Sequence, residues 1–200
     1  MSEPSLILYG TKLSGHAHRV EALLTQLGLS YEYRSAPAEV RRSPEYRRIT
    51  PFGQIPVLID SGRVIPDSGA ILVHLARTYD RDDVWLPRDL ALEVEVQRWL
   101  AIAAGDIRFG PALARLAVRF GVGADLAMAH HVALELFAFM ETHLDGRDWL
   151  VGERPTIADL ACYPYIAVAD EGGLRLDKYP RIEAWIARVE AIPGFARMPR

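Results

Sequence analysis

The sequence has very little cysteine: Cys162 is the only one in 200 residues. A single cysteine excludes an intrachain disulfide and any redox motif that needs two thiols of the same chain. Long apolar runs are also missing, because none approaches the roughly 20 residues that a membrane-spanning helix requires. We therefore expect neither a disulfide framework nor a membrane as a partner.

The sequence also lacks a large excess of positive or negative charge. The chain carries 23 Lys and Arg against 26 Asp and Glu, a formal net charge of −3. Without a broad basic field, nucleic acid is not an expected partner, and any anion site must be local. The histidines and carboxylates show no metal-ligand spacing, so we expect no metal. Residues 1–9 lack the pattern of a secretory signal, which predicts a cytoplasmic protein.

Strand and helix patterns alternate through the first 80 residues. The apolar spacing predicts βαβ followed by ββα, with a short irregular helix at 43–48 before the second half. The hairpin of that second half turns at Ser61-Gly62. The expected strands and helices cover residues 6–9, 20–27, 31–34, 56–60, 63–65 and 68–79.

Every later pattern is helical. We expect one long helix over 90–120, kinked at Gly110-Pro111 because proline removes a backbone hydrogen bond and clashes with the preceding turn. Further helices are expected over 124–144, 156–169 and 179–192. Thr156 and Asp159 have capping-box spacing at the start of one of them.

Two motifs in the first half indicate a ligand site. Pro56 opens a strand, where a residue without an N–H is normally tolerated only at an edge. Either a cis Ile55-Pro56 bond or an ordinary trans edge proline explains this position. About ten residues later, Asp67-Ser68 precedes an apolar helix, which Ser68 is expected to cap.

These motifs, Thr50 to Leu58 and Asp67 to Ile71, follow a segment containing Tyr9, Ser14 and Arg19. Together they resemble the glutathione site of a cytosolic glutathione transferase of bacterial type with a serine-type active site. The resemblance covers nearly the whole chain. It implies a thioredoxin-like domain at 1–80, a linker at 81–87, an all-helical domain at 88–200, and a homodimer.

Ser14 carries the expected chemistry. In the serine-type enzymes that the chain resembles, a hydroxyl at this place donates a hydrogen bond to the glutathione sulfur. The resemblance thus implies that Ser14 activates the thiol, although a plain N-cap is a common use of serine. Tyr9, Thr11 and His16 remain alternative contacts for the sulfur.

The resemblance also implies how glutathione is bound and where its reaction partner lies. Arg42 is the expected contact of the glycine carboxylate, since a guanidinium matches a carboxylate bidentately. The pocket for a hydrophobic electrophile is expected near Asp106, Arg108 and Phe109. The remaining glutathione contacts implied are Gln54, Ile55, Pro56, Asp67 and Ser68.

The expected function is that of a glutathione transferase acting in detoxification, in which a bound thiolate attacks a hydrophobic electrophile. Two alternatives stay open at this point. One is a glutathione-dependent peroxidase or disulfide reductase, which would have to cycle the sulfur of glutathione. The other is a non-catalytic protein that binds glutathione or hydrophobic ligands.

Overall fold

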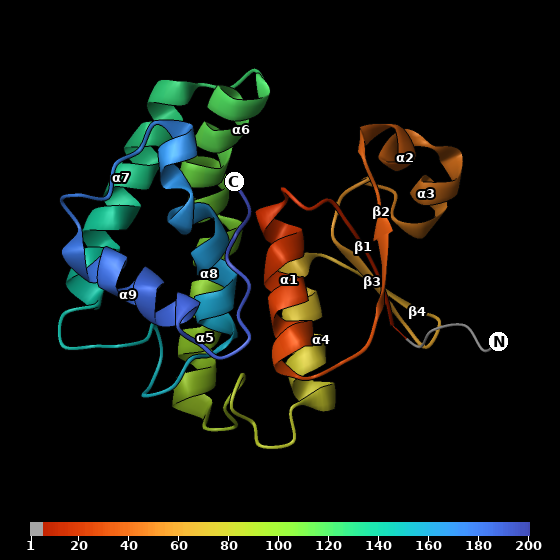
Figure 1. Cartoon of the computed structure of the whole chain (residues 1–200), viewed down its shortest axis with the longest axis horizontal. Helices are drawn as coiled ribbons and strands as arrows, with labels where there is room; N and C mark the ends of the chain where they lie inside the picture. Colours follow the sequence, from red (N-terminus) through yellow and green to blue (C-terminus); the bar gives the residue numbers. More distant parts are fainter. Residues whose placement is uncertain (1–5) are drawn as a thin grey trace.

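The computed structural model describes residues 6–200, so residues 1–5 of the expected first domain lie outside it. A four-stranded sheet lies at one end of the molecule and a bundle of helices at the other (Figure 1). The sheet has the order β2-β1-β3-β4, with β1 parallel to β2 and antiparallel to β3, and β4 antiparallel to β3. This mixed sheet confirms the thioredoxin-like fold. Its strands are β1 (Leu6–Gly10), β2 (Glu32–Ser35), β3 (Val57–Asp60) and β4 (Arg63–Pro66).

Helices cover both faces of the sheet. α1 (Gly15–Gln26) and α4 (Ser68–Tyr79) pack together between the sheet and the helical bundle (Figure 1). On the other side lie α2 (Ala38–Arg42) and α3 (Pro44–Ile49), which cover a small apolar cluster around Tyr46. The sequence patterns predicted α3 but missed α2, whose five residues bury no side chain completely.

The rest of the chain is helical from residue 90 onward. A segment without regular structure precedes it, and buried Trp85 fixes that segment to the body: its carbonyl accepts a hydrogen bond from Ile157 N at 2.8 Å. The helices of this part are α5 (Leu90–Ala104), η1 (Arg108–Ala112), α6 (Leu113–Phe120), α7 (Leu126–His143), α8 (Ile157–Ala167), η2 (Ala169–Gly172) and α9 (Pro180–Glu190).

The helix expected over 90–120 is interrupted before Pro111 is reached. α5 ends at Gly105, whose φ of −101° and ψ of −92° are not helical. The chain then passes through η1, a π-helical segment that contains Pro111. A π turn departs from the regular α-helical hydrogen-bond pattern. The irregular stretch therefore begins earlier than expected, at Gly105, and includes Gly110-Pro111, where the sequence predicted a kink.

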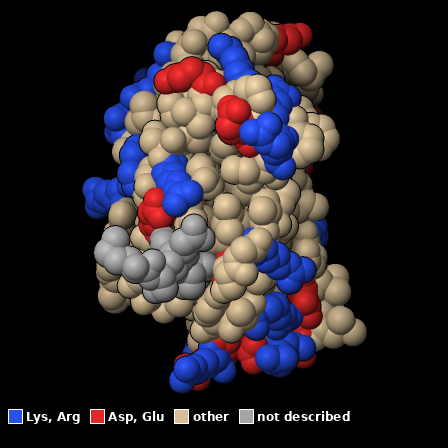
Figure 2. All heavy atoms as spheres, turned by 90° about the vertical axis from the view of Figure 1, so that its right-hand side faces the viewer, with Lys and Arg blue, Asp and Glu red and all other residues tan. Residues whose placement is uncertain are grey.

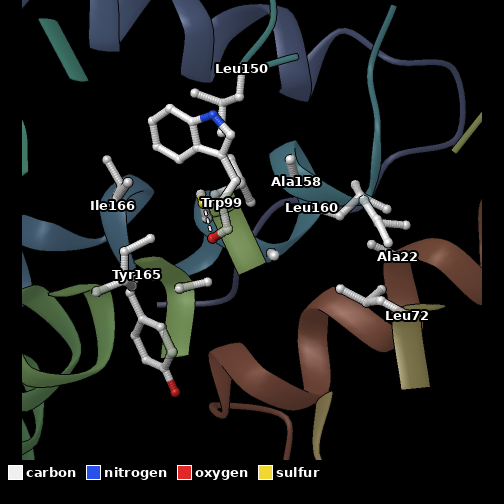
Figure 3. Packing of buried hydrophobic residues seen from close by; sticks show 14 of the residues in the cluster. Ala22, Leu72, Trp99, Leu150, Ala158, Leu160, Tyr165 and Ile166 are labelled. Atoms are coloured by element: carbon white, nitrogen blue, oxygen red, sulfur yellow. Dashed lines mark hydrogen bonds between the residues drawn. The ribbon is translucent and has the colours of Figure 1, made fainter. Parts of the chain in front are cut away.

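One hydrophobic core runs through both ends of the molecule. Ala22 on α1 and Leu72 on α4 lie beside Leu160 of α8, as Figure 3 shows. The same cluster continues to buried Trp99 and to the far side of the bundle. The sheet-containing part and the helical part are therefore joined by apolar packing rather than by a solvated contact.

Within the described residues 6–200, no helix has the length and apolarity needed to cross a membrane. The same residues contain no group of three or more His, Cys, Asp or Glu side chains suited to a metal ion. Figure 2 shows basic and acidic side chains interspersed on one face of the molecule, without a field of one sign.

Candidate functional site

A cavity of about 470 Å³ opens at the N-terminus of α1, and we call it the α1 cavity. The two halves of the fold contribute to it together: the start of α1, the turn before β3 and the start of α4 form one side, and η1, α6 and α8 form the other. Its lining residues are Thr11, Leu13, Ser14, His16, Arg41, Gln54, Ile55, Pro56, Asp67, Ser68, Arg108, Ala112, Arg115, Leu116, Phe120, Val122 and Tyr165.

Ser14 is the N-cap of α1 and faces this cavity. Its Oγ accepts a hydrogen bond from Ala17 N at 3.2 Å, while its own N–H donates to the carbonyl of Thr11 at 3.0 Å. The cap uses the serine oxygen only as an acceptor. The cap therefore does not use the hydroxyl proton, which lies at the positive end of the helix.

The turn before β3 contributes Gln54, Ile55 and Pro56 to the cavity. The Ile55-Pro56 bond is cis, as one of the two readings of the sequence had it. The sheet ladder begins at Val57, which pairs with Tyr9, so the backbone of Ile55 lies beyond the last paired residue. Behind the turn, the Tyr46 hydroxyl donates to the carbonyl of Gln54 at 2.9 Å and fixes its orientation.

The start of α4 differs in one detail from the expectation. Asp67, at a φ of 79°, is the N-cap, and its Oδ1 accepts from Gly69 N at 2.8 Å and Ala70 N at 3.1 Å. The sequence had assigned that cap to Ser68, which is instead the first residue of the helix. The Ser68 hydroxyl is free of capping because the longer Asp67 side chain reaches both amides.

A buried arginine lies behind Ser68. Arg19 is 3% exposed and donates through Nη1 to Ser68 Oγ at 3.4 Å. Its Nε and Nη2 have no hydrogen-bond partner within residues 6–200. Burial lowers the pKa of this guanidinium, against the opposing effects of Tyr165, Cys162 and Asp67. Arg19 thus places positive charge directly beneath the α4 start.

Three arginines line the α1 cavity, but neither Arg19 nor Arg42 is one of them. Arg41, the other member of the basic pair, faces the cavity, while Arg42 is exposed and lies outside it. The two are consecutive on the single turn of α2, so their side chains leave it in different directions. Arg108 and Arg115 approach from the helical side.

Tyr9 lies away from the α1 cavity. Its hydroxyl accepts a hydrogen bond from Arg34 Nη1 at 2.9 Å, and its ring packs edge-on against Tyr46 in the small cluster under α2 and α3. Because side chains of a strand alternate between faces, Tyr9 points to the side opposite α1. Its hydroxyl does not reach the cap of Ser14, so this alternative contact is not supported by the geometry.

His16 and Thr11 both line the α1 cavity. The His16 ring packs edge-on against Tyr165, with 5.0 Å between ring centroids. Burial, followed by the nearby charges of Arg19 and Arg108, holds the pKa of His16 well below its ordinary 6.5. The imidazole is therefore neutral at pH 7 and adds no positive charge to the site.

The expected electrophile residues are only partly brought together. Arg108 lines the cavity, whereas Asp106 and Phe109 are exposed and lie outside it. The sequence pattern missed Arg115 and Tyr165, because both lie far along the chain from Ser14. It also missed the apolar wall of the cavity, formed by Leu13, Ala112, Leu116, Phe120 and Val122.

A second cavity of about 660 Å³, here the α5 cavity, lies between β4, α4 and α5. It shares His16, Asp67, Ser68 and Arg108 with the α1 cavity. Its remaining wall includes Val64, Pro66, Ala70, Val73, Leu100 and Ala104. The start of α4 therefore separates two hollows of the surface.

The α1 cavity combines features that favour a small, extended anion. Among the described residues that line it are Arg41, Arg108 and Arg115, and the one carboxylate among them is that of Asp67, one oxygen of which accepts from two amides. The backbone of Ile55, which precedes the paired residues of β3, offers a partner for a peptide, and the start of α1 offers the Ser14 hydroxyl. The apolar wall opposite them favours a hydrophobic second ligand.

Known proteins of one family match this chain over most of its length. Residues 8–83 match the family model described as Glutathione S-transferase, N-terminal domain, and residues 124–193 match Glutathione S-transferase, C-terminal domain. A glutathione S-transferase from Triticum aestivum is 27% identical over 207 residues, covering 100% of this chain and 96% of that relative.

Solved structures agree with the family models. A glutathione S-transferase from Xanthobacter autotrophicus Py2 is 32% identical with a TM-score of 0.89, covering 98% of this chain and 97% of that one. A glutathione transferase homolog from Drosophila mojavensis, solved with bound glutathione, is 27% identical with a TM-score of 0.83, covering 95% and 89%. Fold and sequence thus agree, and the chain belongs to the glutathione S-transferase family.

Proposed function

We propose that this protein is a glutathione transferase that binds glutathione in the α1 cavity and activates its thiol with the hydroxyl of Ser14. One observation carries the proposal: Ser14, at the N-terminus of α1, faces the same cavity as the unpaired backbone of Ile55 and the start of α4. A solved relative that contains glutathione has the same fold.

The peptide part of glutathione fits the sheet side of the cavity. Its cysteinyl backbone would pair with the backbone of Ile55 as an added strand residue. The γ-glutamyl carboxylate would accept from the Ser68 hydroxyl and the amides of the α4 start, supported by the charge of Arg19. Asp67 would accept from the α-amino group, and Arg41 takes the glycine carboxylate in place of Arg42.

Activation of the thiol is within reach of the groups present. A free thiol with a pKa of about 8.5 is about 3% ionised at pH 7, and lowering that pKa by about two units makes it about three-quarters thiolate. Two units correspond to about 2.7 kcal/mol. One hydrogen bond to a charged acceptor supplies about 1.5–3 kcal/mol and the helix N-terminus about 0.3–1 kcal/mol.

The reaction itself needs little more from the protein. The thiolate forms a bond to an electrophilic carbon, and the leaving group departs with its electron pair. The apolar wall opposite Ser14, formed by Leu116, Phe120 and Val122, would hold the electrophile close to the sulfur. Cys162 takes no part, because it is fully buried and burial raises the pKa of its thiol.

The test is the absorbance of glutathione thiolate on the purified protein, titrated from about pH 5 to 9 around the free-thiol pKa of about 8.5. We expect the bound thiol to ionise well below its free pKa, and Ser14→Ala to bind glutathione but lose the shift and most turnover with an aryl halide. Ser43→Ala is the matched control, because Ser43 caps α3 in the same way, with 3.2 Å from Tyr46 N to Oγ, but lies outside the cavity.

Each alternative function makes a different prediction. Saturable glutathione binding without thiol ionisation would replace the transferase by a binding protein. Turnover with cumene hydroperoxide but not with the aryl halide would indicate a peroxidase. Full turnover in Ser14→Ala would show that the assignment of Ser14 is wrong.

We further propose that the protein is a homodimer that associates through the face around the α5 cavity. On α5, exposed Leu90 and Val94 continue the stripe of Gln97, Leu100 and Ala104 that lines this cavity, since residues three to four apart share a helix face. Val64 on β4 is also exposed beside it. A second copy would cover these apolar side chains.

Sedimentation velocity tests the dimer. Val94→Lys is expected to shift the protein to the monomer, because it places a charge in the centre of the apolar stripe. Val118→Lys is the control: Val118 is 52% exposed, close to the 56% of Val94, but lies on α6. A monomeric wild-type protein would disprove this part of the proposal.

A further inference from the structure

A buried positive charge lies between α1 and α4 with almost no partner in the protein. Within residues 6–200, the guanidinium of Arg19 makes a single hydrogen bond, to Ser68, while its buried Nε and Nη2 have none. Arg115, the other buried arginine of this part of the chain, instead pairs with Glu171. Burial of an unpaired charge costs stability, so packing alone does not account for an arginine at this place.

The hydrogen bond between Arg19 and Ser68 has only one possible direction. A guanidinium carries N–H donors and no acceptor, so Ser68 Oγ accepts from Arg19 Nη1, at 3.4 Å. A serine oxygen has two acceptor sites and one proton, and the proton points away from a donor that occupies an acceptor site. Ser68 lines both the α1 cavity and the α5 cavity, and it therefore faces them as a hydrogen-bond donor.

The other polar groups at the start of α4 have different tasks. Asp67 Oδ1 accepts from Gly69 N at 2.8 Å and from Ala70 N at 3.1 Å, so these two amides are already in use. Burial lowers the pKa of Arg19, and the nearby charge of Asp67 opposes that shift. An anion that approaches this turn would be repelled by Asp67, and the charge of Arg19 offsets that repulsion.

We propose that Arg19 is a positioning residue for Ser68, whose hydroxyl it holds as a donor toward the α-carboxylate of the γ-glutamyl group of glutathione. This inference rests on the proposed function, because it concerns the same ligand. Arg19 acts from behind the serine and needs no contact with the ligand of its own. A hydroxyl that accepts from a cation is also a stronger donor, since hydrogen bonds in a chain polarise one another.

Calorimetry with two ligands tests this role on the full-length protein. One ligand is glutathione, and the other is 4-aminobutanoyl-cysteinylglycine, which lacks only the α-carboxylate of the glutamyl group. Arg19→Met is expected to raise the Kd of glutathione about tenfold, the value of one hydrogen bond to a charged group. The Kd of the second ligand is expected to change by less than about twofold, because the carboxylate that Ser68 would bind is missing.

The double variant shows whether Arg19 acts through Ser68. Ser68→Ala is expected to raise the Kd of glutathione as well. In the Ser68→Ala background, the effect of Arg19→Met is expected to fall from about tenfold to about threefold or less, because coupled residues are not additive. With an aryl halide, the KM of glutathione is expected to rise with its Kd, while kcat at saturating glutathione changes less.

Two further measurements separate this role from folding and from general charge. The urea midpoint of Arg19→Met is expected to equal or exceed that of wild type, because an unpaired buried charge has been removed. A lower midpoint would assign Arg19 to the fold instead. Arg63→Met is the matched control: Arg63 also lines the α5 cavity, but it is exposed and belongs to β4. Its loss is expected to change the Kd of glutathione by less than about twofold.

The outcomes distinguish this inference from the proposed function. Wild-type protein that binds glutathione with the same Kd as Arg19→Met overturns the inference alone. An equal loss of affinity for both ligands overturns it too, as does an equal factor with and without the Ser68 hydroxyl. Failure of the wild-type protein to bind glutathione removes the proposed function and this inference with it.

Discussion

Arg115 on α6 donates through Nη1 to the carbonyl of Leu13, 2.7 Å away, and so ties the helical part of the molecule to the residue before Ser14. Its Nε pairs with Glu171 at 2.5 Å, and its side chain is 2% exposed. Arg119 pairs with the other oxygen of Glu171 from a more exposed position. A buried ion pair therefore holds the loop that leads to α1.

Arg115→Met is expected to destabilise the protein by about 3 kcal/mol, because removal of one partner leaves a buried charge incompletely paired. The control Arg119→Met removes an exposed contact of the same Glu171 and is expected to cost under about 1 kcal/mol. Urea denaturation gives both values. Equal losses in the two variants would contradict the structural role of Arg115.

His16 predicts a loss of stability in mild acid. Its pKa in the folded state lies well below the ordinary 6.5 because of burial. As the pH falls below 6.5, His16 becomes protonated in the unfolded chain but stays neutral in the folded chain. The free energy of unfolding therefore decreases by up to about 1.4 kcal/mol per pH unit until the pH reaches the folded-state pKa. Above 6.5 the group has no such effect.

His16→Asn should therefore be less pH-dependent than wild type. Between pH 7 and about 5.5, the free energy of unfolding of this variant is expected to decrease by about 1 kcal/mol less than that of wild type. His131→Asn is the control, because the His131 side chain is 63% exposed. Parallel pH profiles of wild type and His16→Asn would contradict the lowered pKa of this half-buried imidazole.

Asp159 should be one of the most sensitive positions for stability. Its fully buried carboxylate accepts from Thr156 N at 2.8 Å, Trp185 Nε1 at 2.9 Å and Leu150 N at 3.0 Å. Asp159→Ala leaves three buried donors without a partner, at about 1–3 kcal/mol each, so a loss of at least about 4 kcal/mol is expected.

Thr156→Ala is the control with which the stability loss of Asp159→Ala is compared. It removes only the hydroxyl part of the capping box that the two residues form, at about 1 kcal/mol. The denaturation midpoints of the two variants give the comparison. A loss in Asp159→Ala no larger than that in Thr156→Ala would show that the three donors find other partners.

Gly53 links the turn of Gln54 to α2. Its φ is +60°, and a Cβ there would lie 2.8 Å from the carbonyl oxygen of Arg41. Gly53→Ala is expected to cost about 1–2 kcal/mol for the left-handed backbone and, in addition, to displace Arg41 and raise the Kd of glutathione, measured by calorimetry. Gly28→Ala is the control, since it has a φ of +65° but no atom within 4 Å of the added Cβ; an equal Kd in both variants would exclude the clash.

Local patterns predicted those elements whose causes are local. The hairpin across Ser61-Gly62, the box at Thr156 and the cap at Ser14 each depend on residues within a few positions of one another. The Ile55-Pro56 turn was open to two readings until the structure showed a cis bond. Most of the fold could be predicted in this way.

The parts of the site that were missed depend on distant contacts. Leu13 and Arg115 are 102 residues apart in the chain, and Tyr165 is farther still from Ser14. On α8 every residue from Ile157 to Ile166 is buried, so periodicity could not indicate which side chain faces α1. The sequence could not indicate that Arg41 rather than Arg42 lines the α1 cavity, because that depends on the direction of a single helical turn.

The shared core also limits how the two halves can evolve. Ala22 and Leu72 from the sheet-containing half lie against Leu160 of α8 in one continuous cluster. A fragment cut near residue 80 would expose that contact to water, so neither half is expected to fold stably without the other. Recombination between family members at residues 81–87 would join surfaces that were never fitted to each other, and substitutions on α1 or α4 succeed only with matching changes on α8.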